Sequence, residues 1–152
     1  MSASDSVLET LDEIVTALQA DATVSASFTK IGKIVSPKLI PPFGQTELPA
    51  ICLAPVNSPE AWVTTQKREV RHAIEVYVIG ESFTQETDMR ENLTRIKQVA
   101  DALRGSRLTN YYLNKPIQID SINYDTTPYG EDGSWTFVGT ILLDCRRLFI
   151  GT

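Results

Sequence analysis

The sequence predicts an α+β domain in which two helices pack on one face of an antiparallel or mixed sheet of about four strands. Three observations lead to this prediction: two segments with helical periodicity, alternating strand-like segments around the second of them, and short connections within each pair of strands. Short connections between consecutive strands favour antiparallel pairing. The expected order is helix, strand, strand, helix, strand, strand, in a single domain over residues 1–152.

The first predicted helix runs from Ser6 to Ala20. Its apolar side chains recur at helical spacing, and acidic side chains fall on the other side. Ser6 and Glu9 have the spacing of a capping box, which marks a helix start. The apolar positions are Val7, Leu8, Leu11, Ile14, Val15 and Leu18.

The negative charge of the chain is concentrated in this N-terminal region. The formal net charge is −5 at pH 7, and a phosphate-dominated nucleic-acid site would need clustered Lys and Arg instead. We therefore expect no sequence-specific nucleic-acid binding, although a surface that repels phosphate can let DNA pass. The acids that precede the first basic residue, Lys30, are Asp5, Glu9, Asp12, Glu13 and Asp21.

The segment from Thr23 to Leu48 is predicted to be a long loop, with a short extended piece at Ile31 to Val35. Proline at positions 37, 41 and 42 forbids a continuous helix or a central strand there. Long loops of compact domains are often functional. An apolar strand from Pro49 to Val56 follows and ends at the turn Asn57-Ser58-Pro59.

The clearest strand pattern runs from Lys67 to Ile79. Alternate residues are apolar, which predicts one buried face and one open face. The predicted buried face carries Val70, His72, Ile74, Val76 and Val78. The predicted open face carries Glu69, Arg71, Ala73, Glu75 and Tyr77.

The second helix is predicted from Thr84 to Arg104, with Gly105 as its stop. Two strands close the domain, Ile117 to Tyr124 and Ser134 to Ile150, and the first changes phase as a bulge would. A polar hairpin loop from Asp125 to Gly133 joins them. The predicted helix stripe is Met89, Leu93, Ile96, Ala100 and Leu103.

The sequence contains no constellation typical of catalysis. The only histidine, His72, lies mid-strand on the apolar face, where we expect a hydrogen-bonded core or interface residue. Cys52 and Cys145 lie in apolar runs and are expected to be buried free thiols, with a disulfide or a metal pair as the alternative. Glycine-rich phosphate loops are absent from the sequence. We therefore expect no enzyme, no catalytic residue, no cofactor and no metal.

No stretch of the sequence is long and apolar enough to span a bilayer, and the N-terminus does not read as a signal peptide. Synthesis in the cytoplasm without membrane insertion is expected. Two basic clusters remain: Lys67, Arg68 and Arg71 open the long strand, while Arg146 and Arg147 lie near the end of the last one. Solvated strand ends explain both clusters, and ion pairs with the acidic first helix are the alternative.

In the order of its elements the chain resembles the tail terminator (tail completion) proteins of long-tailed bacteriophages. The resemblance rests on the helix Val7 to Leu18, the segment Leu48 to Pro55, the strand Glu69 to Ile79, the helix Glu86 to Leu103 and the closing hairpin with Trp135 to Leu143. It implies a subunit made in the host cytoplasm that forms a hexameric ring in the virion tail or neck. The ring would bind the tail tube protein, stop tube growth and offer a joining surface for the head-tail connector or neck protein, with the tail sheath as a further partner and the genome passing through.

The residues expected at partner interfaces are Phe43, Tyr124 and Tyr129 as aromatic anchors, together with Arg146 and Arg147. The aromatic residues lie in or beside the two long polar segments, 23–48 and 125–133. We expect partner contacts on these segments, because recognition commonly takes place on loops of a rigid scaffold. Ordinary exposed loops are the alternative interpretation. Alternative functions are another connector, neck or sheath-associated subunit, or a stand-alone binding module.

Overall fold

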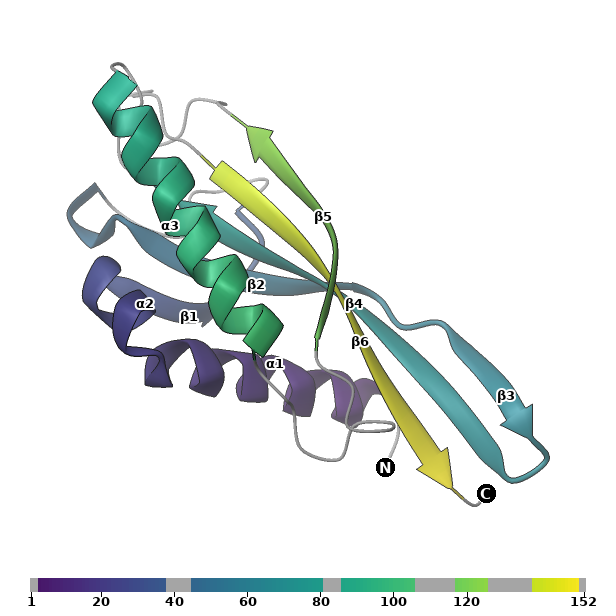
Figure 1. The fold of residues 1–152 in the computed structure, drawn as a ribbon. Coiled ribbons are helices and arrows are strands. Elements are labelled where there is room, and N and C mark those ends of the chain that lie inside the picture. The colour runs from purple at the N-terminus through teal and green to yellow at the C-terminus, as the bar shows by residue number, and fades with distance from the viewer. Residues whose placement is uncertain (1–2, 38–44, 81–85, 106–116, 126–137, 151–152) are drawn as a thin grey trace.

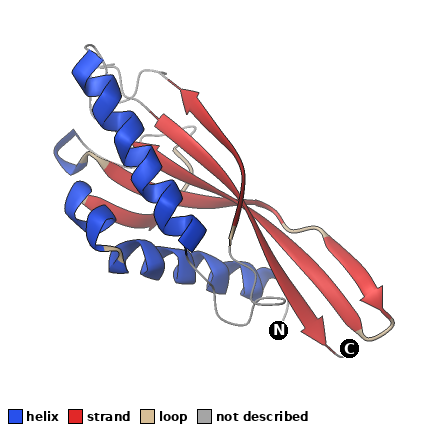
Figure 2. Cartoon of the chain, viewed as in Figure 1, coloured by secondary structure: helices blue, strands red, loops and turns tan. Residues whose placement is uncertain are grey.

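The computed structural model describes residues 3–37, 45–80, 86–105, 117–125 and 138–150 (Figures 1 and 2). Helices and strands follow one another in a mixed order that matches the predicted α+β class. The elements are α1 (Ala3–Ala20), α2 (Ala22–Ser27), β1 (Lys30–Ile34), a 3-10 turn η1 (Gln45–Glu47), β2 (Ala50–Asn57), β3 (Glu60–Thr64), β4 (Lys67–Ile79), α3 (Glu86–Gly105), β5 (Gln118–Asp125) and β6 (Val138–Ile150).

The strands form one mixed sheet of six strands in the order β1-β2-β4-β6-β5, and β3 pairs with β4 outside that path. The pair β1–β2 is parallel, and the other pairs are antiparallel. Strands β4 and β6 pair along their whole length, from Lys67 opposite Ile150 to Ile79 opposite Val138. These two long strands therefore form the centre of the sheet.

The predicted count of about four strands and two helices is wrong, because two short elements carry too little periodicity to be seen in sequence, whereas β1 corresponds to the short extended piece predicted at Ile31 to Val35. Within the predicted loop 23–48 the chain forms α2 and β1, and α2 has only six residues. Asp21 caps α2 by accepting a hydrogen bond from the Val24 amide at 3.0 Å. The other missed element, β3, is exposed along its entire length and so has no apolar alternation.

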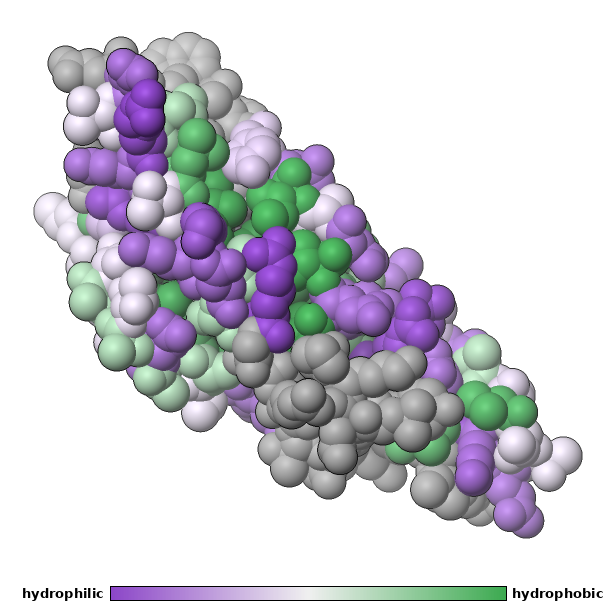
Figure 3. All heavy atoms as spheres, in the orientation of Figure 1, coloured by the Kyte–Doolittle hydropathy of each residue, from purple (hydrophilic) through white to green (hydrophobic). Residues whose placement is uncertain are grey.

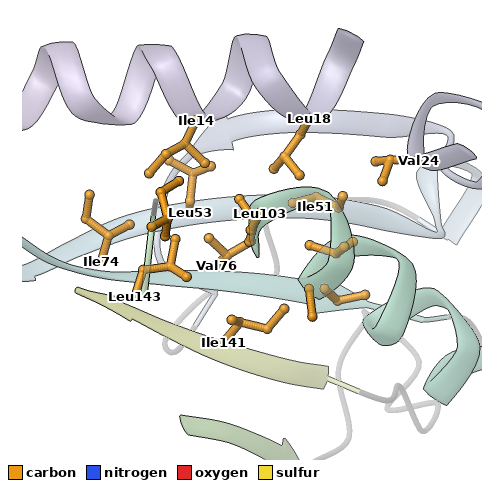
Figure 4. Packing of buried hydrophobic residues seen from close by; sticks show 14 of the residues in the cluster. Ile14, Leu18, Val24, Ile51, Leu53, Ile74, Val76, Leu103, Ile141 and Leu143 are labelled. Carbon is orange, nitrogen blue, oxygen red and sulfur yellow. The ribbon is translucent and has the colours of Figure 1, made fainter. Parts of the chain in front are cut away.

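The main core lies between the helices and one face of the sheet (Figure 4). Side chains from all three helices meet side chains from β2, β4 and β6, as predicted for helices on one face. Residues fully buried in this core include Ile14, Leu18, Val24, Ile51, Leu53, Ile74, Leu103, Ile141 and Leu143.

Two predicted core positions are wrong. Leu8 and Leu93 are 55% and 41% exposed, and Thr10 and Val99 are buried instead. The hydrophobic stripe of each helix is therefore rotated relative to the prediction, because a leucine on the edge of the stripe can face solvent.

A close contact between α1 and β1 depends on a glycine. Gly32 has a φ of 99° at the irregular step of β1, and a Cβ atom there would lie 2.5 Å from Cγ1 of Val15. Only glycine tolerates both conditions. Helix α1 can therefore pack directly over the edge strand.

The opposite face of the sheet carries a smaller cluster made by Cys52, Tyr77, Ile79 and Val138. Tyr77 was predicted on an open face, but it is only 4% exposed, so the sheet is buried on both faces at this end. Cys52 and Cys145 are buried and free, as predicted. Burial raises the pKa of each thiol to about 12, which leaves both protonated at neutral pH.

Candidate assembly interface

A part of the sheet extends beyond the helices, toward the lower right of Figure 1. We call it the arm and define it as β3, residues 67–70 of β4 and residues 147–150 of β6. In the arm β3 pairs with β4 on one side, with Trp62 opposite Arg68, and β6 pairs on the other side. The rest of the described residues form the body.

The arm exposes apolar side chains. Trp62 is 65% exposed and Val63 is 49% exposed, and Val56 at the end of β2 is 52% exposed. In Figure 3 green and pale residues lie among purple ones at this end of the molecule. An exposed tryptophan beside exposed valines is typical of an interaction surface, because aromatic residues are enriched where proteins contact one another.

Charges of both signs flank this tryptophan. Nε of Arg68 lies 3.2 Å from Oε1 of Glu60, and these two side chains are 31% and 41% exposed. Register places Trp62 opposite Arg68, two residues from Glu60 on the same strand. A partly exposed ion pair of this kind adds little stability.

The arm joins the body through buried polar contacts. Arg147 is 7% exposed, and its Nη1 donates a hydrogen bond to Oε2 of Glu9 on α1. His72 is fully buried, as predicted, and its Nδ1 lies 2.7 Å from Oγ of Ser58. Burial and the neighbouring Arg147 cation lower the pKa of His72, while Glu60 opposes them. The base of the arm is thereby fixed to α1.

A second polar cluster lies on the other face of the sheet. Asp144 is 6% exposed and accepts hydrogen bonds from Arg71 at 2.9 Å and from Arg146 at 3.2 Å. The hydrogen bond that Arg71 donates to Asp144 and the negative charge of this carboxylate raise the pKa of Arg71. This buried carboxylate is thus balanced by two cations, Arg71 from the neighbouring strand β4 and Arg146 from β6 itself.

The structure separates the residues that the sequence analysis placed at interfaces. Tyr124 is 57% exposed on β5, opposite Gly139, far along β6 from Arg146 and Arg147. Arg147 uses its charge inside the subunit, and Arg146 contacts Asp144. Phe43 and Tyr129 lie outside the described residues.

Sequence reasoning missed the arm tip and Trp62. A signal was present, because residues 60–64 read Glu-Ala-Trp-Val-Thr, with three good strand formers directly before a polar turn and the strand from Lys67. The Ser58-Pro59 step just before it favoured a turn in that region.

The described residues contain no cluster of three or more His, Cys, Asp or Glu side chains that could hold a metal ion. Among the same residues, no helix has the length and apolar character required to cross a membrane. The described residues combine an exposed arm with a buried core under the helices.

A search of the solved structures finds this fold in a chain of the "Virion of native gene transfer agent (GTA) particle", with a TM-score of 0.59 and 18% sequence identity. The match covers 90% of this chain and 92% of that chain. The two chains share a fold. No family model matches the sequence, and no curated protein matches it.

Proposed function

We propose that the protein is a structural subunit of a phage-like virion and works by assembly, not by catalysis. The observation that carries this proposal is the fold shared with a gene transfer agent virion chain over 90% of this chain and 92% of that one. The exposed arm supports it, since three protruding strands with an exposed tryptophan suit contact with another subunit.

Within the virion, the proposed role is that of a tail terminator. The resemblance in sequence order points to a hexameric ring that caps the tail tube, ends its growth and joins it to the head connector. A ring needs head-to-tail contacts between different surfaces of the same subunit. The arm at one end of an elongated molecule provides one such surface (Figure 1).

The interface residues proposed from sequence divide into three groups in this setting. Tyr124, which is 57% exposed, and Arg146 are accessible for contacts with the tube or the connector. Phe43 and Tyr129 remain proposed anchors. Arg147 is held by Glu9, so we expect it to support the arm from within.

Mixing the purified protein with polymerising tail tube protein tests the proposal. The expected result is binding at one tube end and shorter, capped tubes, seen by electron microscopy. A protein that leaves tube length unchanged but binds a head connector ring would instead indicate a neck subunit. A protein that binds neither would refute the virion assembly role.

A further inference from the structure

The arm and the body meet along one edge of β4. On this edge β2 pairs with the body part of β4, and β3 pairs with the arm part. Residues 58–59 connect β2 to β3; together with residues 71–72 of β4 we call them the junction. The Pro59 carbonyl accepts a hydrogen bond from the Arg71 amide at 3.0 Å. The pairing along this edge thus changes from one strand to the other at the junction, so the contacts there fix the direction of β3.

His72 is the side chain that the junction buries. Its imidazole is fully buried, and Nδ1 lies 2.7 Å from Oγ of Ser58 in the connection. Cys145 lies opposite His72 on β6. Burial raises the pKa of this thiol to about 12, so it stays protonated at neutral pH. The neutral imidazole therefore bonds the connection to the centre of the sheet without bringing a charge into the core.

Charged groups of neighbouring elements surround this imidazole. Arg147 of β6 is 7% exposed and lies on the same face of the sheet as His72. The side chain of Arg147 is paired with Glu9 of α1, and that of Glu60 on β3 is paired with Arg68 of β4. Burial and the Arg147 cation lower the pKa of His72, and Glu60 offsets them only in part. The closed junction therefore resists a positive charge on the imidazole.

We propose that the junction is a pH-sensitive hinge, in which neutral His72 holds the arm against the body and protonated His72 releases it. A protonated ring still donates a hydrogen bond to the Ser58 hydroxyl, so acid does not act by removing this bond. Acid instead places a second cation near Arg147 in a buried site, which is unfavourable. Opening of the connection returns the ring to water, where it binds a proton without that cost.

The direction and size of the effect follow from proton linkage. The pKa of His72 in the closed junction is lowered from 6.5, whereas the ring regains its ordinary pKa when the junction opens. The open form should therefore gain population as the pH falls below 6.5, by up to about tenfold per pH unit until the lowered pKa is reached. Above pH 6.5 the junction should not respond to pH. The hinge lies within one subunit, so it does not depend on the proposed virion role.

Hydrogen exchange of the Arg71 amide in the full chain tests the hinge. This amide is bonded to Pro59 of the connection, so it exchanges when the junction opens. Between about pH 7.5 and about pH 5 its exchange, corrected for the intrinsic effect of pH, should rise by up to about 30-fold. Low concentrations of urea should hardly change it, because a local opening exposes little surface. Exchange that is constant with pH, or that follows urea as steeply as the slowest amides of the body, would overturn the proposal.

Three variants identify the group responsible. His72→Gln keeps a side chain that bonds to Ser58 but cannot gain a charge, so the Arg71 amide should lose its response to pH. Ser58→Ala removes the hydrogen bond and should raise the exchange of the same amide about fivefold at neutral pH. Thr64→Ala, which removes a hydroxyl bonded to the Gln66 amide at the tip of the arm, is the control and should leave it unchanged. A pH response that persists in His72→Gln, or equal exchange in Ser58→Ala and Thr64→Ala, would refute the hinge.

Discussion

The body and the arm share two strands, yet they are stabilised in different ways. In the body, β4 and β6 lie under three helices, and side chains such as Leu53 and Ile141 are fully buried. In the arm the same strands continue without that cover, and Trp62 is 65% exposed. Because β4 and β6 are paired from end to end, the body holds the arm in an extended form before any partner binds.

This difference separates folding from recognition. Side chains of the body stabilise the fold, whereas side chains at the arm tip contribute little to it and are open to a partner. Pre-organisation lowers the entropy cost of binding, since the arm does not have to be ordered on contact. Substitutions in the two regions should therefore affect different measurements.

The largest effect on stability is expected in the body. Leu53→Ala should lower the free energy of unfolding by about 2–5 kcal/mol, because it removes a fully buried side chain and leaves a cavity. Urea denaturation followed by circular dichroism measures it. Trp62→Ala is the control and should change stability by less than about 0.5 kcal/mol. Similar losses for both variants would contradict the division between body and arm.

The base of the arm should show an intermediate effect. Arg147→Ala removes the partner of Glu9, and we expect a loss of about 1–2 kcal/mol, less than for a fully buried pair because Glu9 is 45% exposed. Arg146→Ala, whose side chain is 28% exposed, is the comparison and should cost less. If Arg147→Ala left stability unchanged and abolished assembly, Arg147 would belong to the interface as the sequence suggested.

The buried histidine should give a small, pH-dependent effect. Its folded pKa is lowered from 6.5, so below that pH the unfolded chain binds a proton that the folded chain resists. Stability should then fall as the pH drops from about 6.5 toward the lowered folded pKa, and this contribution is absent above pH 6.5. His72→Gln removes the titrating group. The stability of the two proteins between pH 7.5 and about pH 5 should differ in slope; parallel curves would show that the folded pKa is ordinary.

The elements with strong periodicity could be predicted from sequence, and the short ones could not. Helix α1, helix α3 and strand β4 each bury a regular set of side chains, so the apolar periodicity of these elements could be recognised in the sequence. The phase change predicted between Ile119 and Ile122 is present as a register shift between Ile119 and Ser121. Strand β3 forms because β4 extends beyond the body and provides a strand to pair with. This pairing depends on the tertiary structure and cannot be predicted from the sequence of residues 60–64 alone.

The candidate site could be predicted only in part, for the same reason. The long polar loops were predicted to carry the partner contacts, but the exposed tryptophan, Trp62, lies on the short strand β3. Arg147 was grouped with Arg146 by sequence, yet alternation sends one to Glu9 under α1 and the other to Asp144 on the opposite face. Pairing register, which only the structure supplies, decides which charges are available.

Hydrogen exchange of the arm, measured in the isolated subunit and in the assembled ring, tests the account most directly. In the isolated protein the amides of β3 should exchange fast, because this strand is exposed along its length and pairs with β4 alone among the described residues. In the ring those amides should become protected, while the amides of β4 and β6 within the body keep the protection they already had. Unchanged exchange in β3, with new protection confined to other surfaces, would show that the arm does not carry assembly.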